Sequence, residues 1–317
     1  MSSQTNAAVF RVERLPLLAR LHELGFRGSR KPAPALVKCV ARVGFYLLRR
    51  FRRGPVLGRM QVDVDGAARA ANFDARNRQF AAVYFERYAG GYEPEVAALI
   101  AACVGQRGVL YDVGSNWGYF SVLAAARAGF RGAVHAFEPW PASFRDLRSI
   151  VEQLGLSPPI TCHNLALGES SHRAAMTAGS HSGLAHIARG KGETAVAVRA
   201  LDELVLDPPS LIKIDTEGHE AQVLRGATRL LAAHRPMVIF EHRHENEQQW
   251  RSAGVFDVLA EQGYRLFVPR LDGSGLELLE INAASRAGHA RDANLFACHA
   301  SRMGEMAQMM EPLRRAA

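Results

Sequence analysis

The sequence has no stretch of about 18 consecutive apolar residues, the length that a transmembrane helix needs. Its first residues, MSSQTNAAVFRVERLPLL, also lack the charged start, long apolar centre and small-residue cleavage site of a signal peptide. The four cysteines (Cys39, Cys103, Cys162 and Cys298) show no CxxC spacing, so neither a zinc site nor a disulfide framework is predicted. These absences favour a globular protein of the reducing cytoplasm.

Acidic residues are scarce in the first 60 positions. This segment holds 13 Lys and Arg but only two acids, Glu13 and Glu23, which gives it a net charge of +11. Because the whole chain has a net charge of +8, residues 61–317 have a net charge of −3. The basic character therefore belongs to an N-terminal extension. Nucleic-acid binding would require a basic face on the folded domain, and we expect no nucleic-acid partner.

Residues 35–53 of this extension predict a basic amphipathic helix. On a helix, one side would carry Leu36, Val37, Val40, Gly44, Leu47 and Phe51, and the other Lys38, Arg42, Arg49 and Arg53. One interpretation is peripheral contact with a partner or with an anionic membrane, at its inner face. The other, which we favour, is that the helix caps the globular domain with its apolar face, because most amphipathic helices serve their own protein's core.

The rest of the chain alternates apolar strands with amphipathic helices. A hairpin with an Asp65-Gly66 turn and a helix over 92–103 come first. Strands are expected at Val109–Val113, Ala133–Phe137, Ile160–Leu165, Leu211–Ile214 and Met237–Phe240, with helices that include 141–154 and 219–233. Two further strands, 264–269 and 293–299, separated by a polar, glycine-containing loop, would close the sheet with an antiparallel edge. Residues 168–200 predict a loop followed by a strand that could cover an acceptor site.

This pattern predicts an α/β fold with a Rossmann-like, seven-stranded, mostly parallel sheet, helices on both faces and an N-terminal helical extension. We place the domain at residues 61–300, between a basic, partly helical extension (1–60) and a C-terminal tail (301–317).

The segment VLYDVGSNWGYF, Val109–Phe120, predicts a strand, a tight turn and a helix N-terminus. Glu138 follows Gly118 by 20 residues, at the end of the next strand, where a carboxylate can accept hydrogen bonds from ribose hydroxyls. The loop lacks GxGxxG, and Asp112 before it would repel a pyrophosphate. These features suit S-adenosylmethionine, whose sulfonium and ammonium groups are cationic.

Six motifs in order, DVGSNWGYFS, AFEP, HNLALG, ALDEL, LIKIDTEGHEAQVLRGA and VIFEH, resemble the FkbM family of S-adenosylmethionine-dependent methyltransferases over about residues 90–245. The resemblance implies that the loop residues Asp112, Gly114, Asn116 and Gly118 line the methionine end of the cofactor, and Tyr119 is a further candidate for binding it. It also implies that Glu138 holds the ribose, that Pro139 borders the adenine, and that Asn164 to Ala166 lie near the base. Ser115 replaces the family's usual Ala.

Carboxylates follow the fourth and fifth expected strands, at the edge where ligands bind in open α/β sheets. Asp215, Glu217, Glu241 and His242 are therefore the candidates for taking a proton from the acceptor or holding it. Glu220 is better explained as a helix cap. The acids and His242 could in principle bind a divalent ion, but solvated loop acids are more frequent, so no metal is expected.

Three other functions are less well supported. Methyltransferases that act on nucleic-acid bases carry an acid-Pro-Pro-aromatic motif after the fourth strand, whereas Asp207–Ser210 (DPPS) precedes that strand and is expected to be a turn. A nicotinamide oxidoreductase is disfavoured because this chain lacks the GxGxxG motif. A non-catalytic adaptor that retains the cofactor fold is the remaining alternative. We therefore expect an O-methyltransferase. The resemblance implies a hydroxyl acceptor on a saccharide, lipid-linked glycan or natural product, with N-methylation as the alternative and the oligomeric state open.

Overall fold

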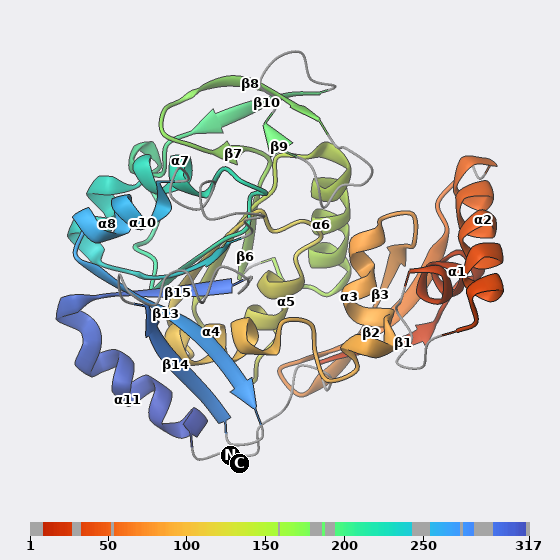
Figure 1. Ribbon diagram of the computed structural model, residues 1–317, viewed down its shortest axis with the longest axis horizontal. Coiled ribbons are helices and arrows are strands. Elements are labelled where there is room, and N and C mark those ends of the chain that lie inside the picture. The colour runs from red at the N-terminus through yellow and green to blue at the C-terminus, as the bar shows by residue number, and fades with distance from the viewer. Residues whose placement is uncertain are drawn as a thin grey trace.

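The computed structural model describes residues 9–26, 33–51, 54–157, 159–177, 186–187, 194–242, 254–272, 275–281 and 294–314. A large sheet runs through the middle of the molecule, and a three-stranded sheet with two helices lies at one end (Figure 1). Residues 243–253, which follow His242, lie outside the described ranges.

The large sheet has the order β14-β13-β15-β12-β11-β4-β5-β6. Its parallel half consists of β4 (Val109–Val113), β5 (Ala133–Phe137), β6 (Ile160–His163), β11 (Leu211–Ile214) and β12 (Met237–Glu241). The antiparallel half consists of β13 (Tyr264–Asp272), β14 (Gly275–Ile281) and β15 (Asn294–His299). The predicted mostly parallel sheet is confirmed, with β14 as an eighth strand at the edge, where we expected a polar loop.

The register of the parallel strands brings their carboxyl ends to one edge. Val113 at the end of β4 is paired with both Phe137 of β5 and Ile214 of β11. The residues that follow these strands, Gly114, Glu138 and Asp215, are therefore neighbours in space although they are far apart in the sequence.

Helices cover both faces of this sheet. Alternate strand residues such as Leu110 and Leu211 pack into one core cluster with α4 (Pro94–Val104), α5 (Tyr119–Ala125), α6 (Pro141–Gln153) and α11 (Met303–Arg314). Their neighbours Tyr111 and Ile212 pack into a second cluster with α7 (Glu220–Arg225), α8 (Thr228–His234) and α10 (Val255–Glu261). This alternation is what a sheet buried on both faces requires.

Two expected segments differ in the structure. The single helix expected over 219–233 is divided into α7 and α8 at Gly226, where a Cβ atom would lie 1.9 Å from the carbonyl oxygen of Gly168. The expected C-terminal tail contains α11, and Met310 of this helix is completely buried. Short helical turns complete the body: η2 (Arg78–Phe80), α3 (Ala81–Tyr84), η3 (Glu86–Tyr88), η5 (Leu201–Glu203) and η7 (Ala300–Arg302).

A second, four-stranded sheet has the order β7-β10-β8-β9. Its strands are β7 (Ala166–Leu167), β8 (His172–Thr177), β9 (His186–Ile187) and β10 (Thr194–Arg199). The strand predicted near the end of the 168–200 segment is confirmed as β10, whereas β8 forms where we expected a loop. The expected loop positions 178–185 and 188–193 lie outside the described residues.

The N-terminal sheet pairs β1 (Phe10–Arg14) with β2 (Leu57–Val64), and β2 with β3 (Ala67–Asp74). The predicted hairpin is confirmed as β2 and β3. The domain boundary that we expected at residue 60 falls within β2, which spans Leu57–Val64. Strand β1, from the expected extension, is hydrogen-bonded to β2. Phe10 also stacks on Tyr119 of α5 with ring centroids 4.9 Å apart, so the N-terminal segment is part of the body.

The predicted amphipathic helix is confirmed as α2 (Ala35–Phe51), which packs against α1 (Leu17–Gly25). Its orientation contradicts the interpretation that we favoured. Leu36, Val40 and Leu47 are exposed, whereas Phe45 is buried. The apolar face that we expected to cap the domain therefore points away from it.

Candidate active site

The loop between β4 and α5 can be built only with glycine at two positions. Gly114 has a φ of 79°, and a Cβ atom there would lie 1.8 Å from the carbonyl oxygen of Asp215. Gly118, with a φ of 90°, precedes the first residue of α5. The N–H groups of Gly114 and Ser115 both donate to the carbonyl of Phe137, at 3.0 and 3.1 Å. The loop is thereby fixed against the end of β5.

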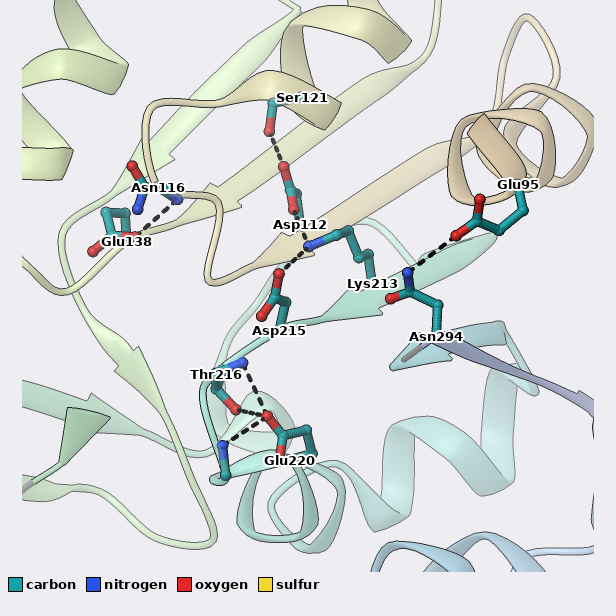
Figure 2. A network of polar contacts seen from close by, with 11 residues as sticks. Glu95, Asp112, Asn116, Ser121, Glu138, Lys213, Asp215, Thr216, Glu220 and Asn294 are labelled. Carbon is teal, nitrogen blue, oxygen red and sulfur yellow. Dashed lines mark hydrogen bonds and ion pairs between the residues drawn. The ribbon is translucent and has the colours of Figure 1, made fainter. Parts of the chain in front are cut away.

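Glu138 is held by this loop. Its carboxylate accepts hydrogen bonds from the N–H of Asn116 at 2.9 Å and the N–H of Trp140 at 2.7 Å, and its side chain is buried (Figure 2). Burial raises the pKa of Glu138 to about 7, although the two N–H groups act in the opposite direction. A carboxylate with this pKa is poised to gain or lose its charge near neutral pH.

A buried lysine lies between the two carboxylates that end β4 and follow β11. The Nζ of Lys213 lies 3.2 Å from Oδ2 of Asp215 and 3.9 Å from Oδ1 of Asp112 (Figure 2). Ser121 donates to the other oxygen of Asp112 at 2.6 Å. Lys213 and Asp112 face each other because they are paired across β11 and β4.

This cluster contains more acids than bases. Burial acts to lower the pKa of Lys213, but Asp215, Asp112 and Glu93 outweigh it and hold the pKa above the usual value. Burial raises the pKa of both Asp112 and Glu93, and the Lys213 ammonium offsets this only in part. Three carboxylates around one ammonium make a site that favours an additional positive charge.

A cavity of about 450 Å³ opens at this edge of the sheet. The loop after β4 lines it with Gly114, Asn116 and Tyr119, and the other parallel strands add Glu138, Pro139, Ala166, Asp215 and Glu217. Met176 of β8 lines it as well, so the four-stranded sheet forms part of its wall. Eight of the predicted site residues therefore share one cavity.

The other predicted cofactor residues lie behind this surface. Asp112 is 1% exposed and reaches the site through Lys213. Gly118 begins α5, and Asn164 donates its amide to the carbonyls of Glu138 and Pro139, at 2.9 and 3.2 Å. Among the residues that the structure describes, these three support the cavity wall and do not line it.

The predicted catalytic residues separate into two groups. Carboxylate oxygens of Asp215, Glu217 and Glu241 lie within 4.8 Å of one another, an arrangement that could hold a metal ion and that is also common without one. Glu217 has a φ of 55°, a strained conformation for a residue with a side chain. His242 packs edge-on against Phe256 of α10, with ring centroids 5.0 Å apart. Neither Glu241 nor His242 is among the described residues that line the cavity.

Glu220, which we expected to cap a helix, lies in the first turn of α7 and binds the preceding loop, whereas the N-cap residue His219 makes no side-chain capping hydrogen bond. One oxygen of Glu220 accepts hydrogen bonds from the N–H of Thr216, the hydroxyl of Thr216 and the N–H of Gly218, at 3.0 to 3.1 Å (Figure 2). It fixes the loop that carries Asp215 and Glu217.

Residues before position 93 form a wall of the cavity that sequence reasoning missed. His22 and Phe26 come from α1 and the residue after it, and Arg78, Arg87 and Tyr88 from the turns between β3 and α4. Lys213 was missed too. Its signal is a lysine within LIKI, a strand that is otherwise apolar and buried on both faces.

The site offers polar groups that suit a nucleoside with a cationic end. Oδ1 of Asp112 and Oγ of Ser115 are buried without a hydrogen-bond partner among the described residues. Glu138 presents a carboxylate at the end of β5, beside the tight turn at Gly114, which packs against the Asp215 carbonyl. The residues present therefore fit S-adenosylmethionine: an acid for the ribose and an excess of negative charge for the sulfonium and ammonium groups.

Comparison with known proteins agrees with this fit. The model of the family described as "Methyltransferase FkbM domain" matches residues 107–266, half of the chain. A hexuronic acid methyltransferase, AglP of Haloferax volcanii, is 30% identical over 145 residues, which cover 44% of this chain and 58% of that protein. The chain thus spans less than two thirds of this relative.

Solved structures with a similar arrangement include an FkbM methyltransferase from Methylobacillus flagellatus. It has a TM-score of 0.41 and 18% identity, and the match covers 61% of this chain and 44% of that one. An S-adenosylmethionine-dependent O-methyltransferase from Thermotoga maritima has a TM-score of 0.38 and 11% identity, covering 82% and 81% of the two chains.

Proposed function

The chain belongs to the FkbM family of methyltransferases and uses S-adenosylmethionine, and from this premise we propose that it methylates a hydroxyl group of an anionic saccharide. The observation that carries the proposal is a single cavity with two chemically different walls. Acids surround Lys213 on one wall, and arginines alternate with aromatic rings on the other.

The acidic wall would serve the methyl donor. When bound, this cofactor supplies an electrophilic methyl group on a positively charged sulfur. Glu138 would accept hydrogen bonds from the ribose, and the excess carboxylate charge around Lys213 would complement the positive charge. Lys213 also fixes the direction of the Asp215 side chain through its contact at 3.2 Å.

The three carboxylates after β11 and β12 are proposed to act on the acceptor. Asp215, Glu217 and Glu241 present oxygens close enough together to hold one hydroxyl group, and one of them would take its proton as the methyl group is transferred. A hydroxyl needs this help because its oxygen is a weak nucleophile while it is protonated. Alignment of donor and acceptor would supply much of the remaining acceleration.

The second wall has the chemistry of a site for an anionic sugar. Arg78 lies over the ring of Phe26, 4.7 Å from its centroid, and its Nε donates to Nε2 of His22 at 3.2 Å. Among the described residues, it makes no ion pair with an acid. Arg87 lies over Tyr88 at 4.5 Å. Guanidinium groups bind carboxylate and phosphate oxygens, and aromatic rings offer flat apolar faces. The relative that methylates a hexuronic acid supports an acceptor with a carboxylate.

Transfer of labelled methyl from S-adenosylmethionine to pairs of oligosaccharides that differ only in glucuronate against glucose tests the proposal. We expect label in the acidic member of each pair. Arg78→Gln should raise KM for the acidic acceptor about tenfold or more, as loss of a charged hydrogen bond implies, with kcat and S-adenosylhomocysteine binding little changed. Equal labelling of both members, or label only in non-saccharide fractions, would contradict the acceptor class.

A further inference from the structure

Helix α2 presents a continuous apolar stripe to solvent. Its members recur every three or four residues and therefore share one face of the helix. Their exposed fractions are 76% for Leu36, 64% for Val40, 54% for Val43, 52% for Leu47 and 75% for Phe51. Single exposed apolar side chains are normal on a protein surface, but a stripe along the whole of a 17-residue helix marks an interaction site.

The opposite face of α2 is the one that holds it to the protein. Ala41 and Phe45 are buried, and the Phe45 ring stacks on His22 of α1 with centroids 4.9 Å apart. Arg42 donates to the carbonyl of Gly25 at 2.7 Å. Figure 1 shows α1 and α2 together at one end of the molecule, away from the large sheet. The stripe is thus exposed in a helix whose orientation is fixed.

The charge of this region has one sign. Between Glu23 and Asp63 the sequence contains ten Lys and Arg and no acid. Four of these, Lys38, Arg42, Arg49 and Arg50, lie on α2 itself. An apolar helical face in a segment whose charges are all basic is the pattern of a helix that lies in the interface of an anionic membrane. Within the described ranges, no helix is long and apolar enough to pass through a bilayer.

We propose that α2 docks this protein on a membrane surface that contains anionic phospholipids, with its apolar stripe at the level of the acyl chains and the exposed Arg50, which lies beside the stripe, among the headgroups. The other basic residues of the segment add to its attraction to the anionic surface. A second copy of the chain is a poorer occupant of the stripe, because pairing two such helices would bring only positive charges together. His22, on which α2 packs, also lines the cavity, so docking would bring the cavity close to lipid-linked acceptors. This last consequence alone rests on the proposed function.

Co-sedimentation of the full chain with vesicles tests the docking. We expect binding to vesicles of phosphatidylglycerol and phosphatidylcholine at low salt, little binding to phosphatidylcholine alone, and release as the salt rises, because surface charges are screened. Val40→Gln and Leu47→Gln together should weaken binding about tenfold or more, since both side chains would otherwise enter the apolar layer. Arg50→Gln should weaken it about fivefold.

Val205→Gln is the matched control, because Val205 is 100% exposed in the body of the protein and should not affect vesicle binding. Cys39, the one exposed cysteine of the four, lies on α2 and can carry an environment-sensitive fluorophore. Its emission should shift to shorter wavelength with anionic vesicles only.

Two results would overturn the docking. One is vesicle binding that the paired substitution leaves unchanged. The other is that the wild type does not bind vesicles but forms a dimer, measured by light scattering, which the paired substitution Val40→Gln and Leu47→Gln dissociates. S-adenosylhomocysteine binding and methyl transfer in the absence of vesicles should be the same in all variants. Failure of the docking is therefore distinguishable from failure of the proposed activity.

Discussion

We predict that the affinity for the cofactor depends on pH through Glu138. Burial places its pKa at about 7, so its ionised fraction falls from about 90% at pH 8 to about 10% at pH 6. The carboxylate already accepts the N–H groups of Asn116 and Trp140, and only the ionised form keeps enough acceptor positions for two ribose hydroxyls as well. The dissociation constant should therefore rise about tenfold between pH 8 and pH 6.

The same pKa predicts how stability responds. Because folding raises the pKa of Glu138 from 4.5 to about 7, the free protein loses stability as the pH rises through this interval, by about 3 kcal/mol at full ionisation. A ligand that binds the carboxylate opposes this loss. The increase in Tm on adding ligand should accordingly be larger at pH 8 than at pH 6.

Calorimetric titration with S-adenosylhomocysteine, which is not consumed, measures the effect. Glu138→Gln should weaken binding at pH 8 about 10- to 100-fold, which corresponds to one hydrogen bond to a charged group of about 1.5–3 kcal/mol, and should remove the pH dependence. Glu152→Gln serves as a control, because that side chain is 62% exposed on α6. A wild-type dissociation constant that stays the same from pH 6 to pH 8 would refute the role given to Glu138.

Four further predictions concern the neighbouring groups. Lys213→Met should lower the free energy of unfolding by about 3–5 kcal/mol in urea titrations, because it leaves the buried Asp112 without its cation; a loss below about 1 kcal/mol would mean that the pair is not buried as a unit. Gly114→Ala should abolish S-adenosylhomocysteine binding, since its Cβ would collide with the Asp215 carbonyl, and unchanged calorimetry would contradict that geometry. Glu217→Gly should raise stability by about 1 kcal/mol through release of the positive φ while methyl transfer falls, and a loss of both would show that the strain is not there. Exhaustive chelation should leave methyl transfer unchanged, whereas a loss that Mg²⁺ restores would show that the carboxylates act through an ion.

The helical turn η2 connects the loop between β4 and α5 to the cavity wall that carries Arg78. Trp117 of the loop is buried, stacks on Phe80 with centroids 4.7 Å apart and donates its indole N–H to the carbonyl of Gln79 at 3.1 Å. The wall that carries Arg78 is therefore packed directly on the loop that ends β4. This contact explains how residues so early in the chain take part in the site.

The residues that meet at the carboxyl ends of β4 and β5 could be predicted from the sequence alone. Gly114, Gly118 and Glu138 were predictable because a strand, a tight turn and a helix that follow one another leave a local pattern of apolar, glycine and acidic residues. The parallel sheet was predictable for the same reason, since strands buried on both faces are nearly continuous apolar runs. The edge strand β14 was missed because its short run of Leu and Glu lies within a stretch, 270–292, that contains several Gly and charged residues.

The groups that lie opposite these residues could not be predicted from local sequence patterns. Lys213 lies beside Asp112 because β11 pairs with β4 in one particular register. That register cannot be predicted from the sequence of either strand alone. The arginine-bearing wall comes from residues far earlier in the chain. The direction of α2 depends on which of its faces Phe45 and His22 bury, and periodicity identified the two faces without saying which one packs. Secondary structure depends mainly on residues that are neighbours in the sequence. Which segments face each other across a cavity depends on how the whole chain packs.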